Sequence, residues 1–403
     1  MRTLVIAQML GGAGLAAGIT VGALLAEDVL GATSFSGLPA ALFTTGSAVA
    51  ALLLGRLSQR FGRRIGLTAG YATGAIGGGA IVLAAVWDNI PLFVAAMVIY
   101  GAGFAANLQA RYAGADLADP ARRGRAISIV LVATTVGAVA GPNLVKLTGR
   151  IAESVGMPGL TGPFALAAIA YAAAAMVLAL FLRPDPLLTA RTIGAGADQE
   201  PNEVTESPAR EHTAGNIRLA ALAMVLTQVV MIAVMTMTPV HMRDHGHGLG
   251  SIGFVIAIHV AFMYLPSPLT GVLVDRVGRL PVIGSAATIL LLAGLIAASA
   301  PADSMVLLTL ALAMLGLGWN LGLIGGTALL TDSASLATRA RTQGTVDLSV
   351  ALAGATGGLS SGFIVASTSY PALALVGGVL ALLILPATLS AKRLPVTNSS
   401  SNS

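Results

Sequence analysis

Long apolar stretches alternate with short polar segments along the whole chain. Each apolar stretch has about 20 residues, which is enough for a helix to cross a hydrocarbon core of ~30 Å. In lipid, a helix satisfies its own backbone hydrogen bonds, so the pattern predicts an all-helical membrane protein. The twelve expected spans are residues 4–26, 36–55, 66–87, 91–112, 125–146, 161–182, 218–240, 250–273, 281–300, 305–330, 345–366 and 371–391.

The longest polar interruption divides these spans into two sets of six. We expect an N-terminal six-helix bundle at 1–182, a linker at 183–217, a C-terminal six-helix bundle at 218–391 and a tail at 392–403. The linker contains several prolines and an acidic run from Asp198 to Glu206, which predicts a flexible or partly helical segment.

Composition supports a membrane location and excludes several functions. Hydrophobic residues make up 56% of the chain and charged residues only 10%, whereas soluble domains carry about 25% charged residues. The absence of cysteine excludes disulfides and thiolate metal sites. Basic residues are scattered over short loops, so nucleic-acid binding is not expected. No catalytic constellation is visible, and we expect no enzymatic activity and no resident cofactor.

The distribution of basic residues predicts orientation. If the N-terminus lies in the cytoplasm, all but three of the 22 Lys and Arg residues fall on cytoplasmic segments, the exceptions being Lys146, Arg150 and Arg243. Cytoplasmic loops are enriched in basic residues. We therefore expect a multi-pass protein of the bacterial inner membrane, with both termini and the linker in the cytoplasm.

The two halves carry related loops. Residues 55–64 read GRLSQRFGRR after the second span, and residues 271–279 read GVLVDRVGR after the eighth. This pattern resembles the signature loop of the major facilitator superfamily, and the span number and central linker agree with it. The resemblance implies two pseudo-symmetric bundles with a substrate site between them. It also implies a conformational latch, for which the candidates are Gly55, Arg60, Gly62, Arg63, Gly271, Asp275, Arg276, Gly278 and Arg279. Gln59 replaces the expected acid in the first copy, which puts that latch in doubt, and the arginines could instead be topology anchors only.

Two motifs on the seventh and eighth spans suggest metal handling. Met231 and Met235 are four residues apart, as are His259 and Met263, so each pair shares one helix face. Met231 and His259 each lie about 13 Å from the outer end of their helix. Thioethers favour monovalent copper. The methionines could equally be flexible packing residues, and His259 could bind a backbone carbonyl or carry a proton.

These paired motifs are similar to those of bacterial copper importers of the CcoA type. That resemblance implies copper import, with the four side chains as transient ligands and copper as substrate rather than cofactor. The wider family also includes proposed riboflavin carriers, and the absence of cysteine departs from the importer pattern. A possible metal-capture cluster precedes the eighth span and comprises Met237, His241, Met242, His245 and His247. The same residues could simply form a polar turn.

Other polar residues suggest a different cargo. Asn107, Gln109, Trp319 and Asn320 could line a cavity for an organic solute, although the two asparagines could instead bond across helices. Asp347 is a possible proton site, or a structural partner for a loop arginine such as Arg341. Arg111 is expected to anchor the fourth span at the inner interface.

The leading hypothesis from sequence is therefore a monomeric secondary transporter that imports copper by alternating access. The alternative is a transporter of an organic solute such as riboflavin or a drug, possibly coupled to protons. A non-transporting membrane receptor or scaffold of the same fold is a third possibility.

Overall fold

A computed structural model describes residues 1–30, 38–197 and 209–392. Every regular element within these ranges is a helix, as expected. The elements are α1 (Arg2–Leu30), α2 (Leu38–Phe61), α3 (Arg63–Val86), α4 (Ile90–Asp116), η2 (Pro120–Arg122), α5 (Arg123–Ser154), η3 (Gly159–Thr161), α6 (Gly162–Phe181), α7 (Pro186–Ala197), α8 (Ala209–Asp244), α9 (Leu249–Tyr264), α10 (Ser267–Val277), α11 (Arg279–Ser299), α12 (Met305–Ser333), α13 (Arg339–Ser367), α14 (Tyr370–Ala381) and α15 (Ile384–Lys392).

Eleven segments of the described chain are long and apolar enough to cross a membrane. In order, they correspond to the second through twelfth predicted spans. The first predicted span falls on α1, a helix of 29 residues. The hydrophobic pattern therefore located the membrane helices well.

Two predicted spans consist of paired helices rather than one. The eighth is divided between α9 and α10 around Pro266, and the twelfth between α14 and α15 ahead of Pro386. Proline lacks a backbone N–H and clashes with the preceding turn, so it interrupts a helix without ending the membrane crossing.

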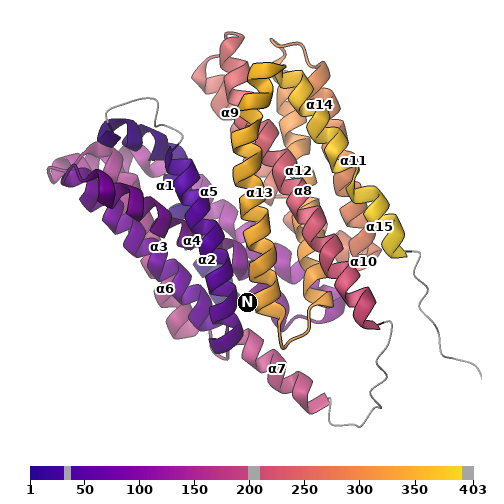
Figure 1. The fold of residues 1–403 in the computed structure, drawn as a ribbon. Helices are drawn as coiled ribbons and strands as arrows, with labels where there is room; N and C mark the ends of the chain where they lie inside the picture. The colour runs from indigo at the N-terminus through magenta and orange to yellow at the C-terminus, as the bar shows by residue number, and fades with distance from the viewer. Residues whose placement is uncertain (31–37, 198–208, 393–403) are drawn as a thin grey trace, which may run out of the picture.

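The helices form two bundles that lie side by side (Figure 1). One apolar core contains residues of α1 to α6 and Leu182, and the other contains residues of α8 to α15. Four residues of α4 and α5, namely Tyr112, Ala115, Ile127 and Leu131, pack in the core of the second bundle. The two halves are thus joined through α4 and α5.

Part of the polar segment between the halves is helical. Helix α7 lies below the bundles (Figure 1), and we call this end of the molecule the linker end. Asp185 fixes the start of the segment, because its carboxylate accepts hydrogen bonds from the backbone N–H groups of Arg64, at 2.7 Å, and Leu187, at 3.0 Å. The acidic run and nearly all of the predicted tail lie outside the described residues.

Candidate functional site at the junction of the two halves

The two signature loops bind the opposite half in equivalent ways at the linker end. The Asp275 carboxylate on α10 accepts hydrogen bonds from the N–H groups of Gly124, at 2.8 Å, and Arg125, at 3.1 Å, at the start of α5. The Gln59 side-chain oxygen on α2 accepts from the N–H groups of Ala340, at 2.8 Å, and Arg341, at 3.3 Å, at the start of α13. Helix N-termini have unpaired N–H groups that favour such acceptors.

Glutamine at position 59 makes bonds that an acid could not. Besides accepting two N–H groups, the Gln59 side chain donates to the carbonyl oxygens of Ala337, at 2.6 Å, and Leu336, at 3.3 Å. A carboxylate cannot donate these bonds. Gln59 therefore makes the inter-half contact in place of an acid.

Close backbone packing accompanies these bonds. A Cβ added at Gly55 would lie only 2.7 Å from Cα of Gly344 on α13, and one added at Gly271 would lie 2.6 Å from the Gly124 oxygen. Gly62 and Gly278 have φ of +92° and +101°, which only glycine adopts without strain, and each turns the chain between two helices.

The loop arginines divide into two pairs. Arg63 and Arg279 are held at the linker end, whereas Arg60 and Arg276 are exposed. The Arg63 Nε donates to Asp116 at 2.8 Å, and its Nη2 donates to Gln343 of the other half. Both ionic side chains of the Arg63–Asp116 pair are fully buried.

The second half repeats this arrangement around Asp332 at the end of α12. Its carboxylate accepts a hydrogen bond from Arg279 Nε at 2.7 Å and another from Arg123 Nη1 of the first half at 2.5 Å. Arg339 likewise approaches Asp116 across the halves, at 3.9 Å. Each half thus contributes an arginine to the carboxylate of the other.

A further buried ion pair lies deeper between the halves. Arg111 Nη2 on α4 donates to Asp347 Oδ1 on α13 at 2.6 Å, and the two side chains are only 1% and 7% exposed. Tyr112 donates its hydroxyl to the same oxygen at 2.9 Å, and Arg111 Nε donates to Thr327 Oγ1 at 3.0 Å. At 1.5 Å per residue, Asp347 lies about 12 Å along α13 from its start at Arg339.

This pair corrects two expectations. Arg111 is not an interfacial anchor, because it is buried and bound to the other half. Asp347 binds Arg111 rather than Arg341. The remaining carboxylate oxygen of Asp347 is buried and has no hydrogen-bond partner among the described residues, so it is available to a proton or a ligand donor.

Aromatic and amide groups of α8, α9 and α12 form a cluster in the second half. Trp319 Nε1 on α12 donates to Gln228 Oε1 on α8 at 2.8 Å. Tyr264 on α9 packs edge-on against Trp319, with ring centroids 5.7 Å apart. We call Gln228, Tyr264 and Trp319 the aromatic–amide cluster.

The other three residues predicted to line a cavity are buried within or between helices. Asn320 donates to the Met263 carbonyl oxygen at 2.7 Å and accepts from Thr270 at 2.6 Å, so it bridges the interruption between α9 and α10. Asn107 donates to Tyr71 at 3.3 Å. Gln109 donates to the Ala51 oxygen at 2.7 Å. The structure gives the two asparagines the cross-helix role that sequence left open.

The proposed copper ligands lie in the second half, mostly within its core. Met231 and Met263 are buried in its apolar cluster, and Met235 packs against that cluster. The His259 ring is fully buried, with Nδ1 2.9 Å from the Leu312 carbonyl oxygen, which matches the backbone-carbonyl alternative. Its Nε2 has no hydrogen-bond partner among the described residues.

The predicted capture residues do not form a single cluster of ligands. His241 stacks on Tyr370 with ring centroids 4.4 Å apart, and its ring lies 4.4 Å from that of His245. His247 binds the Ala302 oxygen at 3.0 Å. Met242 is buried, and Met237 is partly buried and packs against the apolar core. Within the described residues, no group of three or more His, Asp or Glu side chains is arranged to hold a metal.

Sequence reasoning missed several polar partners. The sequence patterns did not single out Gln228, Gln343, Asp116 or Asp332. Each of them nevertheless binds a residue that was a candidate. Asp116 and Asp332 lie at the ends of the fourth and tenth spans, which are equivalent in the two halves. A comparison of the two halves could therefore have identified them. Gln228 carried no such signal.

Comparison with known proteins identifies the family. The model of the Major Facilitator Superfamily matches residues 4–321 and 219–403. An uncharacterized MFS-type transporter, YdeG of Bacillus subtilis, is 58% identical over 383 residues, which cover 94% of this chain and 89% of that protein. The riboflavin transporter RfnT of Brucella anthropi is 30% identical over 355 residues, covering 85% of this chain and 83% of RfnT.

Solved structures agree on the fold. A structure of the proton:xylose symporter XylE, bound to 6-bromo-6-deoxy-D-glucose, has a TM-score of 0.74 and covers 98% of this chain and 95% of XylE, at 19% identity. The predicted all-helical fold is thereby confirmed. The family model and the similar relatives, which are transporters, confirm the expectation that the protein is not an enzyme. The chain belongs to the major facilitator superfamily of membrane transporters.

Proposed function

We propose that this protein is a secondary transporter of an organic solute, with its site where the Arg111–Asp347 pair meets the aromatic–amide cluster. The observation that carries the proposal is a buried ion pair joining the two halves within the membrane. Charges at such depth are costly and usually functional. Apolar side chains would join the halves at no such cost.

The contacts between the halves support alternating access. Within the described residues, the hydrogen bonds and ion pairs between the halves lie at the linker end. They involve the linker-end parts of α2, α3, α4, α5, α10, α11, α12 and α13, with η2, α7 and the segment before α13. Basic residues favour a cytoplasmic linker end. In this orientation both termini lie in the cytoplasm of a bacterium and the bundles cross its inner membrane. The structure, with its halves joined at the linker end, is then the outward-facing state.

The chemistry of the site favours a planar, polar ring system. Trp319 and Tyr264 contribute aromatic rings that are buried in this state, while Gln228 and Arg111 contribute hydrogen-bonding groups. Ligand sites typically combine such apolar walls with a few polar groups. Similarity to a riboflavin transporter agrees with this class, and riboflavin is the first compound to test.

Asp347 offers a route for proton coupling. Its carboxylate carries one of the two charges that hold α13 to α4, so protonation weakens this inter-half contact. A proton arriving from the outer side would thereby favour opening of the linker end.

Uptake in riboflavin-requiring cells tests the proposal. Cells that lack their own riboflavin importer should grow on low riboflavin when they express this chain, and Trp319→Ala should abolish growth at equal membrane expression. Asp244→Ala, at an exposed residue near Arg243, is a control outside the site. Growth that is independent of Trp319 would contradict the assigned site.

Copper import is a second candidate, favoured by the buried and unpartnered Nε2 of His259 between methionine-bearing helices. It ranks second because the thioethers pack mainly among apolar side chains. Radiocopper accumulation that disappears in Met231→Ala and His259→Ala, but persists in Trp319→Ala, would reverse this order. A monomeric state remains a prediction.

A further inference from the structure

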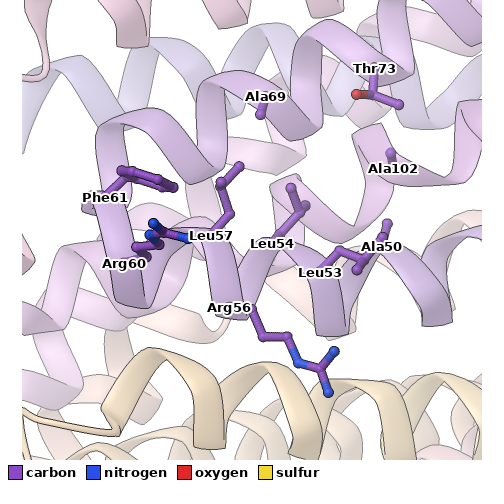
Figure 2. Close-up of a pocket in the computed structure, with 10 residues that line it drawn as sticks. All are labelled: Ala50, Leu53, Leu54, Arg56, Leu57, Arg60, Phe61, Ala69, Thr73 and Ala102. Carbon is purple, nitrogen blue, oxygen red and sulfur yellow. The ribbon is translucent and has the colours of Figure 1, made fainter.

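A groove on the first half lies apart from the central site. It has a volume of about 450 Å³ and runs along α2, α3 and α4. Its walls are mainly apolar side chains, including Leu57 and Ala69, whereas Arg56 and Arg60 stand on α2 near its end (Figure 2).

The groove opens toward the surroundings of the bundle. Leu53 is 54% exposed and Phe61 is 44% exposed, although both are large apolar residues. In a membrane-spanning bundle, such side chains face acyl chains rather than water. The groove is therefore accessible from lipid.

Its length matches one leaflet. The lining residues of α2 extend from Ala50 to Phe61, which at 1.5 Å per residue is about 17 Å. Half of a ~30 Å hydrocarbon core is about 15 Å. Phe61 is also the last residue of its membrane-spanning segment, so the arginines stand where lipid headgroups begin.

The two arginines supply the complementary charge. Arg56 and Arg60 are four residues apart on α2 and both are exposed, with the Arg56 side chain extending away from Arg60 in this structure (Figure 2). Neither takes part in any ion pair found among the described residues, and Arg60 lies over the Phe61 ring at 5.0 Å. Arginine binds phosphate through paired N–H groups.

The second half does not repeat this combination. At the positions equivalent to Arg56 and Phe61 in the repeated loop, it has Val272 and Val277. Arg276 alone matches Arg60. The paired arginines are thus a feature of the first half and not a general requirement of the loop.

We propose that this groove binds an anionic phospholipid of the linker-side leaflet, with an acyl chain along Leu53 and Leu57 and its phosphate at Arg56 and Arg60. The site lies beside the contact between α2 and α13, since Gly55 precedes Arg56 and packs against Gly344. A bound lipid would cover this edge of the closed linker end.

Native mass spectrometry of delipidated protein tests the proposal, with phosphatidylglycerol and phosphatidylcholine added separately. We expect tighter binding of one phosphatidylglycerol, weakened about fivefold for each arginine changed to glutamine. Arg56→Gln/Arg60→Gln should therefore lose about 25-fold. The matched control is Arg122→Gln/Arg341→Gln, which removes two exposed arginines from the same end but outside the groove.

A second variant tests the groove itself without changing charge. Ala69→Phe should fill the apolar part and reduce binding of the first phosphatidylglycerol, whereas Ile65→Phe, at an exposed position outside the groove, should not. Equal losses in the two arginine double variants would overturn the proposal, because they would show unspecific attraction to basic residues. Unchanged binding in Ala69→Phe would also overturn it.

Discussion

Replacing Asp347 with asparagine should shift the protein toward a state that is open at the linker end. The change removes a charge-assisted bond of 2.6 Å between α13 and α4. Arg111 keeps its bonds to Thr327, Tyr112 and the Leu108 oxygen, so it is not left without partners. The loss is therefore about 1.5–3 kcal/mol, below the 3–5 kcal/mol of a fully orphaned buried charge.

This free energy acts on the conformational equilibrium more than on folding, because the bond joins two halves whose apolar cores are largely distinct. At 1.4 kcal/mol per factor of ten, the population ratio should change about 10- to 150-fold. A linker-open state of about 1% would then rise to at least about 10%, which is readily detected.

The absence of cysteine makes the measurement direct. Spin labels at Ile65→Cys and Val277→Cys, both exposed at the linker end of opposite halves, report the separation by electron-spin distance measurement. Asp347→Asn should add a longer distance population, and Asp244→Asn, which removes the same charge from an exposed residue, should not. An unchanged distance distribution in Asp347→Asn would refute the reasoning.

Three further changes probe the linker-end contacts. Gly55→Ala should force α2 away from Gly344 and increase the population at the longer spin-label distance. Gly79→Ala, whose Cβ would meet no atom within 4 Å, should not, and equal effects of the two changes would contradict the packing argument. Asp275→Ala removes the acceptor at the start of α5 and should weaken the contact between the halves by about 1 kcal/mol. The same assay should then show about a fivefold population shift, and no shift would exclude a latch role. Arg63→Met leaves a buried carboxylate without its closest partner and should lower the apparent unfolding temperature in detergent by several degrees, a drop that would be absent if the ion pair were dispensable.

The fold was predictable because membrane burial requires long apolar helices and basic loops. Local repeats were equally informative, since Asp275 and its counterpart Gln59 mark the same position in both halves. Proline interruptions such as Pro266 were not anticipated as helix ends, because the surrounding composition remains apolar and the crossing continues.

Partner choice was much harder to predict. Arg111 and Asp347 are 236 residues apart, and nothing local shows that α4 and α13 face each other. Spacing also could not show what surrounds the metal motif, since Met231 and Met263 pack in the apolar cluster of the second half. Spacing along a helix defines a face, whereas function depends on what that face meets.

The most direct test of the central claim is uptake of radiolabelled riboflavin into proteoliposomes with an inward proton gradient. The account predicts saturable accumulation that is lost in Asp347→Asn and Trp319→Ala and retained in Asp244→Asn. Absence of riboflavin uptake, together with copper uptake that requires Met231 and His259, would contradict it.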